Sequence, residues 1–147
     1  MHQHEVEQVI ALYRLCHPQW PNRSTTWFES VNSLVLREKG RVVAWTAYTL
    51  SPPPSVDLAT NLGPTATCCW LVDTCVAPEA RGRGLAGILM DQRVRAAEEC
   101  GCCMVLGACA HDNAAMVSLL ESRGFKPVAE AMFPDGPGSF YLKTLGV

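Results

Sequence analysis

The sequence has 147 residues, 48% of them hydrophobic, which is typical of one globular domain that buries its own core. Its formal net charge of −2 excludes the broad positive field by which proteins hold nucleic acid. The polar start of the chain shows no secretion signal, and the longest uncharged apolar stretch, 100–110, is too short to span a bilayer. We therefore expect a single domain over residues 1–147, located in the cytoplasm, without a membrane or nucleic-acid partner.

The first third of the chain is predicted to hold two helices and a hairpin. Apolar residues recur at helical spacing over 3–16 and indicate an amphipathic helix. The hydroxyl of Ser24 can cap a short second helix. Strands are predicted at 33–38 and 41–50, and Lys39-Gly40 between them predicts an antiparallel hairpin.

The middle of the chain alternates between loops, strands and helices. A loop over 51–65 contains four prolines, and its length is typical of functional loops. A strand is predicted at 67–76, where a following proline ends the ladder. A helix over 85–99 and a buried strand over 102–108 come next.

The last third is predicted to form a helix and a second pair of strands. The helix over 113–123 ends at Gly124, because glycine accepts the left-handed conformation that follows many helices. Strands are expected at 125–132 and 139–145, joined by a loop over 133–138. The whole order predicts one α/β sheet, part antiparallel and part parallel, with helices packed on it.

The eight cysteines are expected to be reduced thiols, because nothing in the sequence directs the chain to an oxidising compartment. Cys100 and Cys103 form a C-x-x-C pair, but a structural zinc site needs a second ligand pair and none stands at a suitable spacing. We interpret most cysteines as small buried apolar residues of strands and predict no metal site, with metal binding by the C-x-x-C pair as the alternative.

The stretch 76–87 is the most informative part of the sequence, because a strand ends there, a glycine-rich turn follows and a helix begins. Free backbone N–H groups at a helix N-terminus carry partial positive charge and bind anions. Gly82 and Gly84 allow a ligand to approach the backbone, and Arg81 and Arg83 add charge where a phosphate would lie. The pattern predicts a phosphate or pyrophosphate site.

Two other interpretations of this stretch stay open. Residues 82–87 match the Rossmann fingerprint G-x-G-x-x-G, which would indicate a nucleotide-binding domain. That fingerprint needs its first glycine at the strand end and an acidic residue about 20 positions further on. Here 77–81 separate the strand from the glycine, and 100–110 contain no acid, so the match is weak. The second alternative is a turn in which the arginines are merely solvated.

Two motifs together resemble the GNAT superfamily of N-acetyltransferases. The family's pyrophosphate loop reads Q/R-x-x-G-x-G/A, which Arg81-Gly82-Arg83-Gly84-Leu85-Ala86 fits, and Val76-x-Pro78 is similar to the strand end before it. Asn113-Ala114-Ala115-Met116, followed by a helix that closes on Gly124-Phe125, resembles the second motif. The close resemblance covers about residues 68–130. The family's usual opening strand has no counterpart, since we expect the chain to start almost directly in a helix.

The resemblance implies a fold and a co-substrate. It implies a GNAT-like mixed sheet that splays between the two parallel strands at 67–76 and 102–108, with the pantetheine arm of acetyl-CoA in the splay. Backbone groups of Cys75 and Val76 would hold the pantetheine and polarise the thioester carbonyl. The set that would hold the pyrophosphate comprises Arg81 and the backbone amides of Gly82, Arg83, Gly84, Leu85 and Ala86. Asn113 would bind the CoA arm, and a plain helix cap is its alternative role.

Catalysis needs a group that removes a proton from the attacking amine, because a lysine-like amine has a pKa near ~10.4. We favour Asp73, which alternation places on the same strand face as Cys75; a carboxylate merely paired with an arginine is its alternative. His111 is the second candidate, because imidazole titrates near neutral pH, although a solvated loop histidine is its alternative. A water-mediated base is a third possibility.

The usual general acid of the family is missing. Many members carry a tyrosine in the second motif, and Leu120 stands at that position here. Cys109, His111 and Tyr141 are candidate substitutes. A CoA thiol resembles cysteine, with a pKa near ~8.5, so its thiolate leaves fairly well without an acid.

The sequence thus predicts an acetyl-CoA-dependent N-acetyltransferase that acetylates a primary amine of a small molecule, peptide or protein. The alternative is a GNAT-like module that binds acyl-CoA without catalysis, which Leu120 motivates. The acceptor amine is not indicated by any residue pattern. The missing opening strand would leave the hairpin at 33–50 as an open edge, which favours a homodimer.

Overall fold

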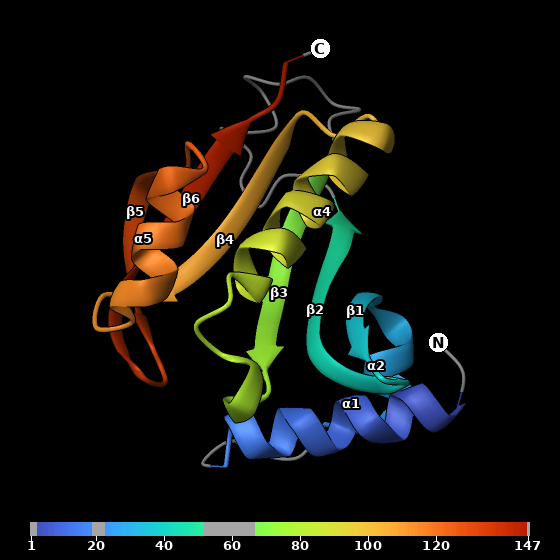
Figure 1. The fold of residues 1–147 in the computed structure, drawn as a ribbon. Helices are drawn as coiled ribbons and strands as arrows, with labels where there is room; N and C mark the ends of the chain where they lie inside the picture. Colours follow the sequence, from blue (N-terminus) through green and yellow to red (C-terminus); the bar gives the residue numbers. More distant parts are fainter. Residues whose placement is uncertain (1–2, 19–22, 52–66, 147) are drawn as a thin grey trace. The chain divides into compact units, whose positions relative to one another are not determined.

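The computed structural model describes residues 3–18, 23–51 and 67–146. Its elements in chain order are α1 (Gln3–Cys16), α2 (Thr25–Ser30), β1 (Asn32–Glu38), β2 (Arg41–Ser51), β3 (Cys68–Val76), the 3-10 helix η1 (Pro78–Ala80), α4 (Leu85–Glu99), β4 (Met104–Ala110), α5 (Ala114–Ser122), β5 (Lys126–Phe133) and β6 (Gly136–Thr144), which Figure 1 colours along the chain. The strands form one six-stranded sheet in the order β1-β2-β3-β4-β6-β5. The predicted α/β sheet is therefore confirmed.

The sheet combines both kinds of pairing, as the sequence predicted. β1 and β2 are antiparallel, as are β4 with β6 and β5 with β6, whereas β3 and β4 are parallel. The parallel pairs join Cys68–Trp70 to Met104–Leu106, while β3 runs on to Val76 and β4 to Ala110. The splay expected beyond these pairs stays a prediction.

The chain divides into two compact units, and the assignment of residues 1–147 to a single domain stays a prediction. The first unit comprises residues 1–49 and 72–93, and the second comprises residues 50–71 and 94–147. The proline-rich loop expected at 51–65 lies outside the described residues beyond Ser51. Within the described part of the chain, no helix combines the length and apolar character needed to cross a bilayer.

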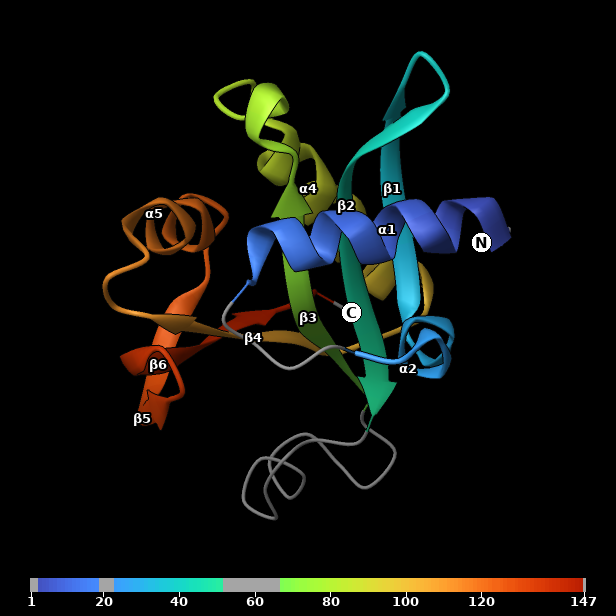
Figure 2. The ribbon, with the colours of Figure 1, turned by 90° about the horizontal axis from the view of Figure 1, so that it is seen from below.

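The first unit packs helices on both faces of its strands. Figure 2 shows α1 running across β1, β2 and β3, and the Gln8 side chain accepts a hydrogen bond from the Val42 N–H of β2 at 2.7 Å. Trp45 of β2 faces α1 and is fully buried. The next residue, Thr46, points to the opposite face, where its hydroxyl meets Thr74, and Thr74 accepts a bond from Arg93 of α4.

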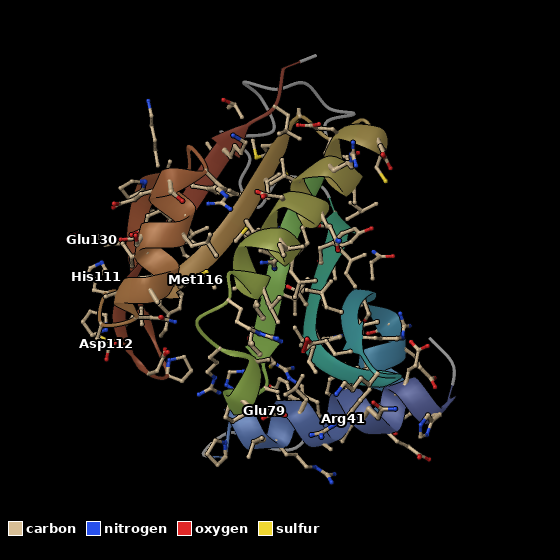
Figure 3. All side chains as sticks on the ribbon, in the orientation of Figure 1. Arg41, Glu79, His111, Asp112, Met116 and Glu130 are labelled. Atoms are coloured by element: carbon tan, nitrogen blue, oxygen red, sulfur yellow. The ribbon has the colours of Figure 1, made fainter. Side chains whose placement is uncertain are left out.

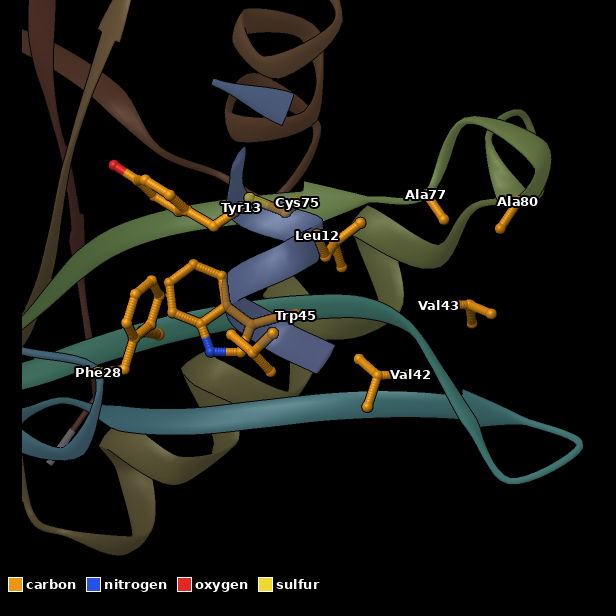
Figure 4. Close-up of a cluster of buried hydrophobic side chains, with 11 residues drawn as sticks. Leu12, Tyr13, Phe28, Val42, Val43, Trp45, Cys75, Ala77 and Ala80 are labelled. Carbon is orange, nitrogen blue, oxygen red and sulfur yellow. The ribbon is translucent and has the colours of Figure 1, made fainter. Parts of the chain in front are cut away.

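Aromatic rings form the centre of the core between α1, α2 and β2 (Figure 4). The Tyr13 and Phe28 ring centroids lie 5.5 Å apart, and those of Phe28 and Trp45 lie 5.6 Å apart, both edge to face. Edge-to-face pairs add about 0.5–1.5 kcal/mol to the stabilisation from burial. The indole N–H of Trp45 donates to the Ser33 hydroxyl at 3.0 Å, so this buried donor is satisfied. The core therefore fixes the position of α1 on β2.

Capping and turn residues end the elements of the first unit where the sequence predicted. Ser24 caps α2 and accepts a hydrogen bond from the Trp27 N–H at 3.1 Å. Lys39 and Gly40 take positive φ values of 53° and 75°, which close the β1–β2 hairpin in two residues.

The second unit corrects two boundaries. The strand predicted at 102–108 lies at Met104–Ala110, because its antiparallel partner β6 extends the pairing to Ala110, which lies opposite Gly138. The loop predicted at 133–138 is a turn of two residues, 134–135, since Phe133 already pairs with Gly136. A side chain at position 138 would overlap the Cys109 carbonyl and the Phe133 ring, so this glycine is required by close packing in a strand.

The helix of the second unit begins and ends as predicted within one residue. Asn113 caps α5, and Gly124 follows it with a φ of 84°. The Lys143 ammonium of β6 donates to the Arg123 carbonyl at 2.8 Å and so fixes the C-terminal end of α5 to this strand. Leu120, on the buried side of α5, is only 2% exposed.

Candidate active site

The loop between β3 and α4 has the geometry of an anion site. β3 ends at Val76, η1 follows, and α4 begins at Leu85. The first hydrogen bond within α4 in the described residues runs from the Ile88 N–H to the Gly84 carbonyl at 3.1 Å. The amides of Leu85 and Ala86 precede this bond, so they have no acceptor within the helix. These are the amides that the sequence predicted to hold a pyrophosphate.

Gly82 and Gly84 shape this loop through their backbone conformation. Their φ values are 78° and 76°, in the left-handed region that costs an L-residue about 1–2 kcal/mol. A Cβ atom at either position would meet no described atom within 4 Å. Both glycines are therefore required by the turn rather than by crowding, and the space beside them is open to a ligand.

The two arginines of the loop already have partners in the protein. Arg81 donates from Nε to the Val76 carbonyl at 3.1 Å, and its Nη2 lies 3.7 Å from the Cys16 sulfur. Arg83 forms an exposed ion pair with Glu38 of β1, and this hydrogen bond lowers the pKa of the Glu38 carboxyl. Both guanidinium groups therefore stay close to the loop, but each contacts protein groups.

Asp73 lies on the face of β3 that packs against α1. Both of its carboxylate oxygens lie 3.2 Å from Nε2 of His17, which directly follows α1. Asp73 also accepts a hydrogen bond from the Thr74 N–H at 2.8 Å. The predicted alternative was a pair with an arginine, and the partner observed is a histidine. The His17 ring packs on Tyr13 with centroids 4.7 Å apart, which fixes its orientation.

Cys75 shares this face with Asp73, as the predicted alternation requires, and lies near α1 in Figure 4. Its thiol forms a hydrogen bond with the Cys16 sulfur, which lowers the pKa of Cys16 to about 6, with Arg81 adding to the effect. The same bond, together with burial, raises the pKa of Cys75. Sequence reasoning missed His17 and Cys16, since each meets its partner across more than fifty residues of chain.

Arg93 of α4 is a further residue that the sequence did not reveal. It is 2% exposed and donates to the Ala47 carbonyl at 3.2 Å and to the Thr74 hydroxyl at 3.0 Å. Thr46 in turn donates to the Asp73 carbonyl at 2.5 Å. These contacts hold β2 and the end of β3 together behind Asp73. An arginine inside an amphipathic helix gives no sequence signal of this role.

The remaining predicted site residues lie in the second unit. Asn113 accepts a hydrogen bond from the Met116 N–H at 3.3 Å, so it has the capping role that was its alternative. His111 lies after β4, beside Asp112 in Figure 3, and its Nε2 is 3.0 Å from the Ser139 hydroxyl. Tyr141 is buried on β6 opposite Gly107, and burial raises the pKa of its phenol. The roles of all three in catalysis or binding stay predictions.

The first unit thus has a glycine-rich loop before a helix N-terminus, the arrangement by which α/β proteins take phosphate-containing cofactors. The loop also excludes the dinucleotide alternative, because η1 separates Gly82 from the end of β3. A family model described as Acetyltransferase (GNAT) family matches residues 5–125. The chain belongs to the acetyltransferase (GNAT) family, whose co-substrate is acetyl-CoA. This confirms the family predicted from the two motifs.

Solved structures of low sequence identity share the fold. A ribosomal-protein-alanine N-acetyltransferase from Brucella melitensis is 19% identical, with a TM-score of 0.78, over 99% of this chain and 97% of that one. NAA60 of Arabidopsis thaliana in complex with acetyl-CoA is 13% identical, with a TM-score of 0.83, over 99% and 96%. The putative acetyltransferase yncA of Salmonella typhimurium, solved with acetyl-CoA, is 19% identical, with a TM-score of 0.77, over 99% and 91%. No curated protein matches the sequence.

Proposed function

We propose that this protein transfers the acetyl group of acetyl-CoA to a primary amine of a small molecule or a peptide. The observation that carries the proposal is the loop from Arg81 to Ala86, whose two left-handed glycines and free helix amides stand in a chain of the GNAT family. Backbone amides at this loop would bind the pyrophosphate of acetyl-CoA. Backbone groups of Cys75 and Val76 would hold the pantetheine arm.

The proton of the attacking amine would pass to the pair formed by Asp73 and His17. The amine must be neutral to attack the thioester, and it has a pKa near ~10.4 when it resembles lysine. A carboxylate in contact with an imidazole at 3.2 Å offers two groups that share an incoming proton. Proton transfer of this kind contributes typically about 10²–10⁴-fold to a rate. We therefore propose Asp73 as the base, with His17 sharing the proton that it accepts.

The alternative function is binding of acyl-CoA without catalysis, and burial of Leu120 favours it. Leu120 is 2% exposed and carries no proton to donate, so the position of the usual acid is part of the core. Because a thiolate with a pKa near ~8.5 leaves without much help, we favour catalysis over binding alone. Tyr141, His111 and Cys109 remain the proposed substitutes.

The test is an acetyl-transfer assay with purified protein, acetyl-CoA and a panel of amines and N-terminal peptides, with CoA release followed by a thiol reagent. Turnover that depends on the amine supports the proposal. Binding of acetyl-CoA without turnover on any amine leaves the binding module as the function. Stabilisation by NADH but not by acetyl-CoA contradicts both.

We infer in addition that the protein works in the cytoplasm as a homodimer. All eight cysteines are free thiols, as expected for a reducing compartment. β1 stands at one edge of the sheet, where unpaired backbone groups favour pairing with a second chain. Light scattering across a range of protein concentrations tests the dimer, and a monomer at the highest concentration contradicts it.

A further inference from the structure

A cluster of nitrogen, oxygen and sulfur donors lies where the end of α1 meets β3. His17, Asp73 and Cys75 each offer one donor atom, and these atoms all lie within 4.8 Å of one another. Cys75 is buried, and the side chains of His17 and Asp73 are only 16% and 18% exposed. The cluster lies wholly within the first unit, so its geometry is set by one packed group of elements.

The spacing of these donors suits a tetrahedral metal ion. Bonds of about 2.0–2.3 Å at tetrahedral angles place neighbouring ligand atoms about 3.3–3.8 Å apart. Nε2 of His17 already lies 3.2 Å from both carboxylate oxygens of Asp73. Because the donor atoms of His17, Asp73 and Cys75 already lie within 4.8 Å of one another, side-chain shifts of about 1 Å bring these three to this spacing.

Cys16 can supply a fourth donor, although its sulfur is not among the atoms that all lie within 4.8 Å of one another. Its sulfur forms a hydrogen bond with the Cys75 thiol and lies 3.7 Å from the Val76 carbonyl oxygen, at the edge of the same cluster. The guanidinium of Arg81 is 3.7 Å from this sulfur. The positive charge of Arg81 does not exclude a cation, because Asp73 and two thiolates carry three negative charges, which a divalent ion and one arginine neutralise.

We propose that Cys16, His17, Asp73 and Cys75 form a site for a Zn²⁺ ion. Zinc accepts sulfur, imidazole and carboxylate ligands in a tetrahedral arrangement, whereas magnesium and calcium select oxygen donors. Cys16 and His17 are adjacent at the end of α1, and Asp73 and Cys75 lie on one face of β3. The ion would therefore link the helix to the strand. Among the described residues, Cys100 and Cys103 of the C-x-x-C pair belong to no group of three such donors.

Metal binding has a consequence that rests on the proposed function. Coordination uses the same atoms of His17 and Asp73 that would receive the amine's proton. A bound Zn²⁺ therefore blocks proton transfer, and the metal-free protein is the active form. Zinc is thereby an inhibitor of acetyl transfer at this site, and its removal by a chelator restores the rate.

The test is a titration of untagged, reduced protein with Co²⁺, which reports thiolate ligation by near-ultraviolet charge-transfer absorption and tetrahedral geometry by intense visible bands. We expect saturation at one Co²⁺ per chain and bleaching of the bands by Zn²⁺. His17→Gln and Cys75→Ser should each weaken binding by at least about 100-fold, since even outer-shell changes cost about 10–100-fold. The matched controls His111→Gln and Cys100→Ser/Cys103→Ser should bind Co²⁺ as the wild type does.

The outcomes separate the metal site from the proposed function. Absence of charge-transfer bands in the wild type overturns the site, as does their persistence in both His17→Gln and Cys75→Ser. Circular dichroism shows that each variant is folded. If the metal-free protein binds Co²⁺ as expected but acetylates no amine, the site stands and the proposed function fails.

Discussion

Replacement of Gly84 by valine tests the anion loop, and Gly40→Val provides a matched control. Gly84 has a φ of 76° and Gly40 a φ of 75°, and a Cβ atom at either meets no described atom within 4 Å. The two substitutions therefore carry the same backbone strain, about 1–2 kcal/mol. For a chain of this size, that lowers the melting temperature by about 2–8 °C in both variants. Only Gly84 lies in the proposed pyrophosphate loop.

The assay is thermal unfolding with and without acetyl-CoA. A ligand that binds only the folded state stabilises it by about 2.7 kcal/mol at a hundred times its Kd. If a side chain at position 84 weakens binding by about 100-fold, the same ligand concentration stabilises Gly84→Val by only about 0.4 kcal/mol. Gly40→Val should keep the full shift. A wild-type shift in Gly84→Val, or equal losses in the two variants, would refute the assignment of this loop.

Three further measurements test other parts of the structure. In a pH–rate profile, Asp73→Asn and His17→Gln should each lower kcat at neutral pH by about 10²–10⁴-fold, and kcat should partly recover at high pH. The affinity for acetyl-CoA should stay unchanged. Alkylation of Cys16 in metal-free protein by iodoacetamide, followed by mass spectrometry, should show an apparent pKa of about 6. The alkylation rate should fall below that pH as the thiolate is protonated. Removal of the Cys75 thiol should raise the pKa of Cys16. Arg93→Met should lower the free energy of unfolding by about 2–4 kcal/mol in urea, because it removes the donor to a buried carbonyl and to a partly buried hydroxyl. Arg95→Met on the exposed face should change it by less than about 0.5 kcal/mol.

Local chemistry explains why most element boundaries could be predicted from the sequence. Ser24, the Lys39-Gly40 turn and Gly124 act on their immediate neighbours, so their residue types indicate the ends of helices and strands directly. The two boundaries that were wrong depend on a partner strand. β4 extends to Ala110 and the turn after Phe133 shortens because of the register with β6, which is a contact between segments distant in sequence.

The candidate site likewise has one part that the sequence predicts and one part that depends on contacts between distant residues. The anion loop is a contiguous stretch, so its glycines and arginines could be recognised as a unit before the fold was known. The His17–Asp73 contact joins residues 56 apart, and no spacing rule connects them. Tyr13 places the ring of His17, and Tyr13 is itself placed by the aromatic core on β2. The pair that we propose to accept the proton is thus a product of tertiary packing, which a pattern of residues does not encode.

Packing in the second unit explains why the proposed catalysis does not need the usual tyrosine. Leu120 and Phe125 lie in the core of the second unit, where apolar side chains stabilise the end of α5. A hydroxyl buried there without a partner would cost about 1–3 kcal/mol. Leu120 therefore contributes to the core, and under the proposed function proton transfer would depend on other groups. On β3, Asp73 has both a histidine and a backbone amide as partners, whereas position 120 offers none of this chemistry. The strand, and not the second motif, is where variants should change the pH dependence of the rate.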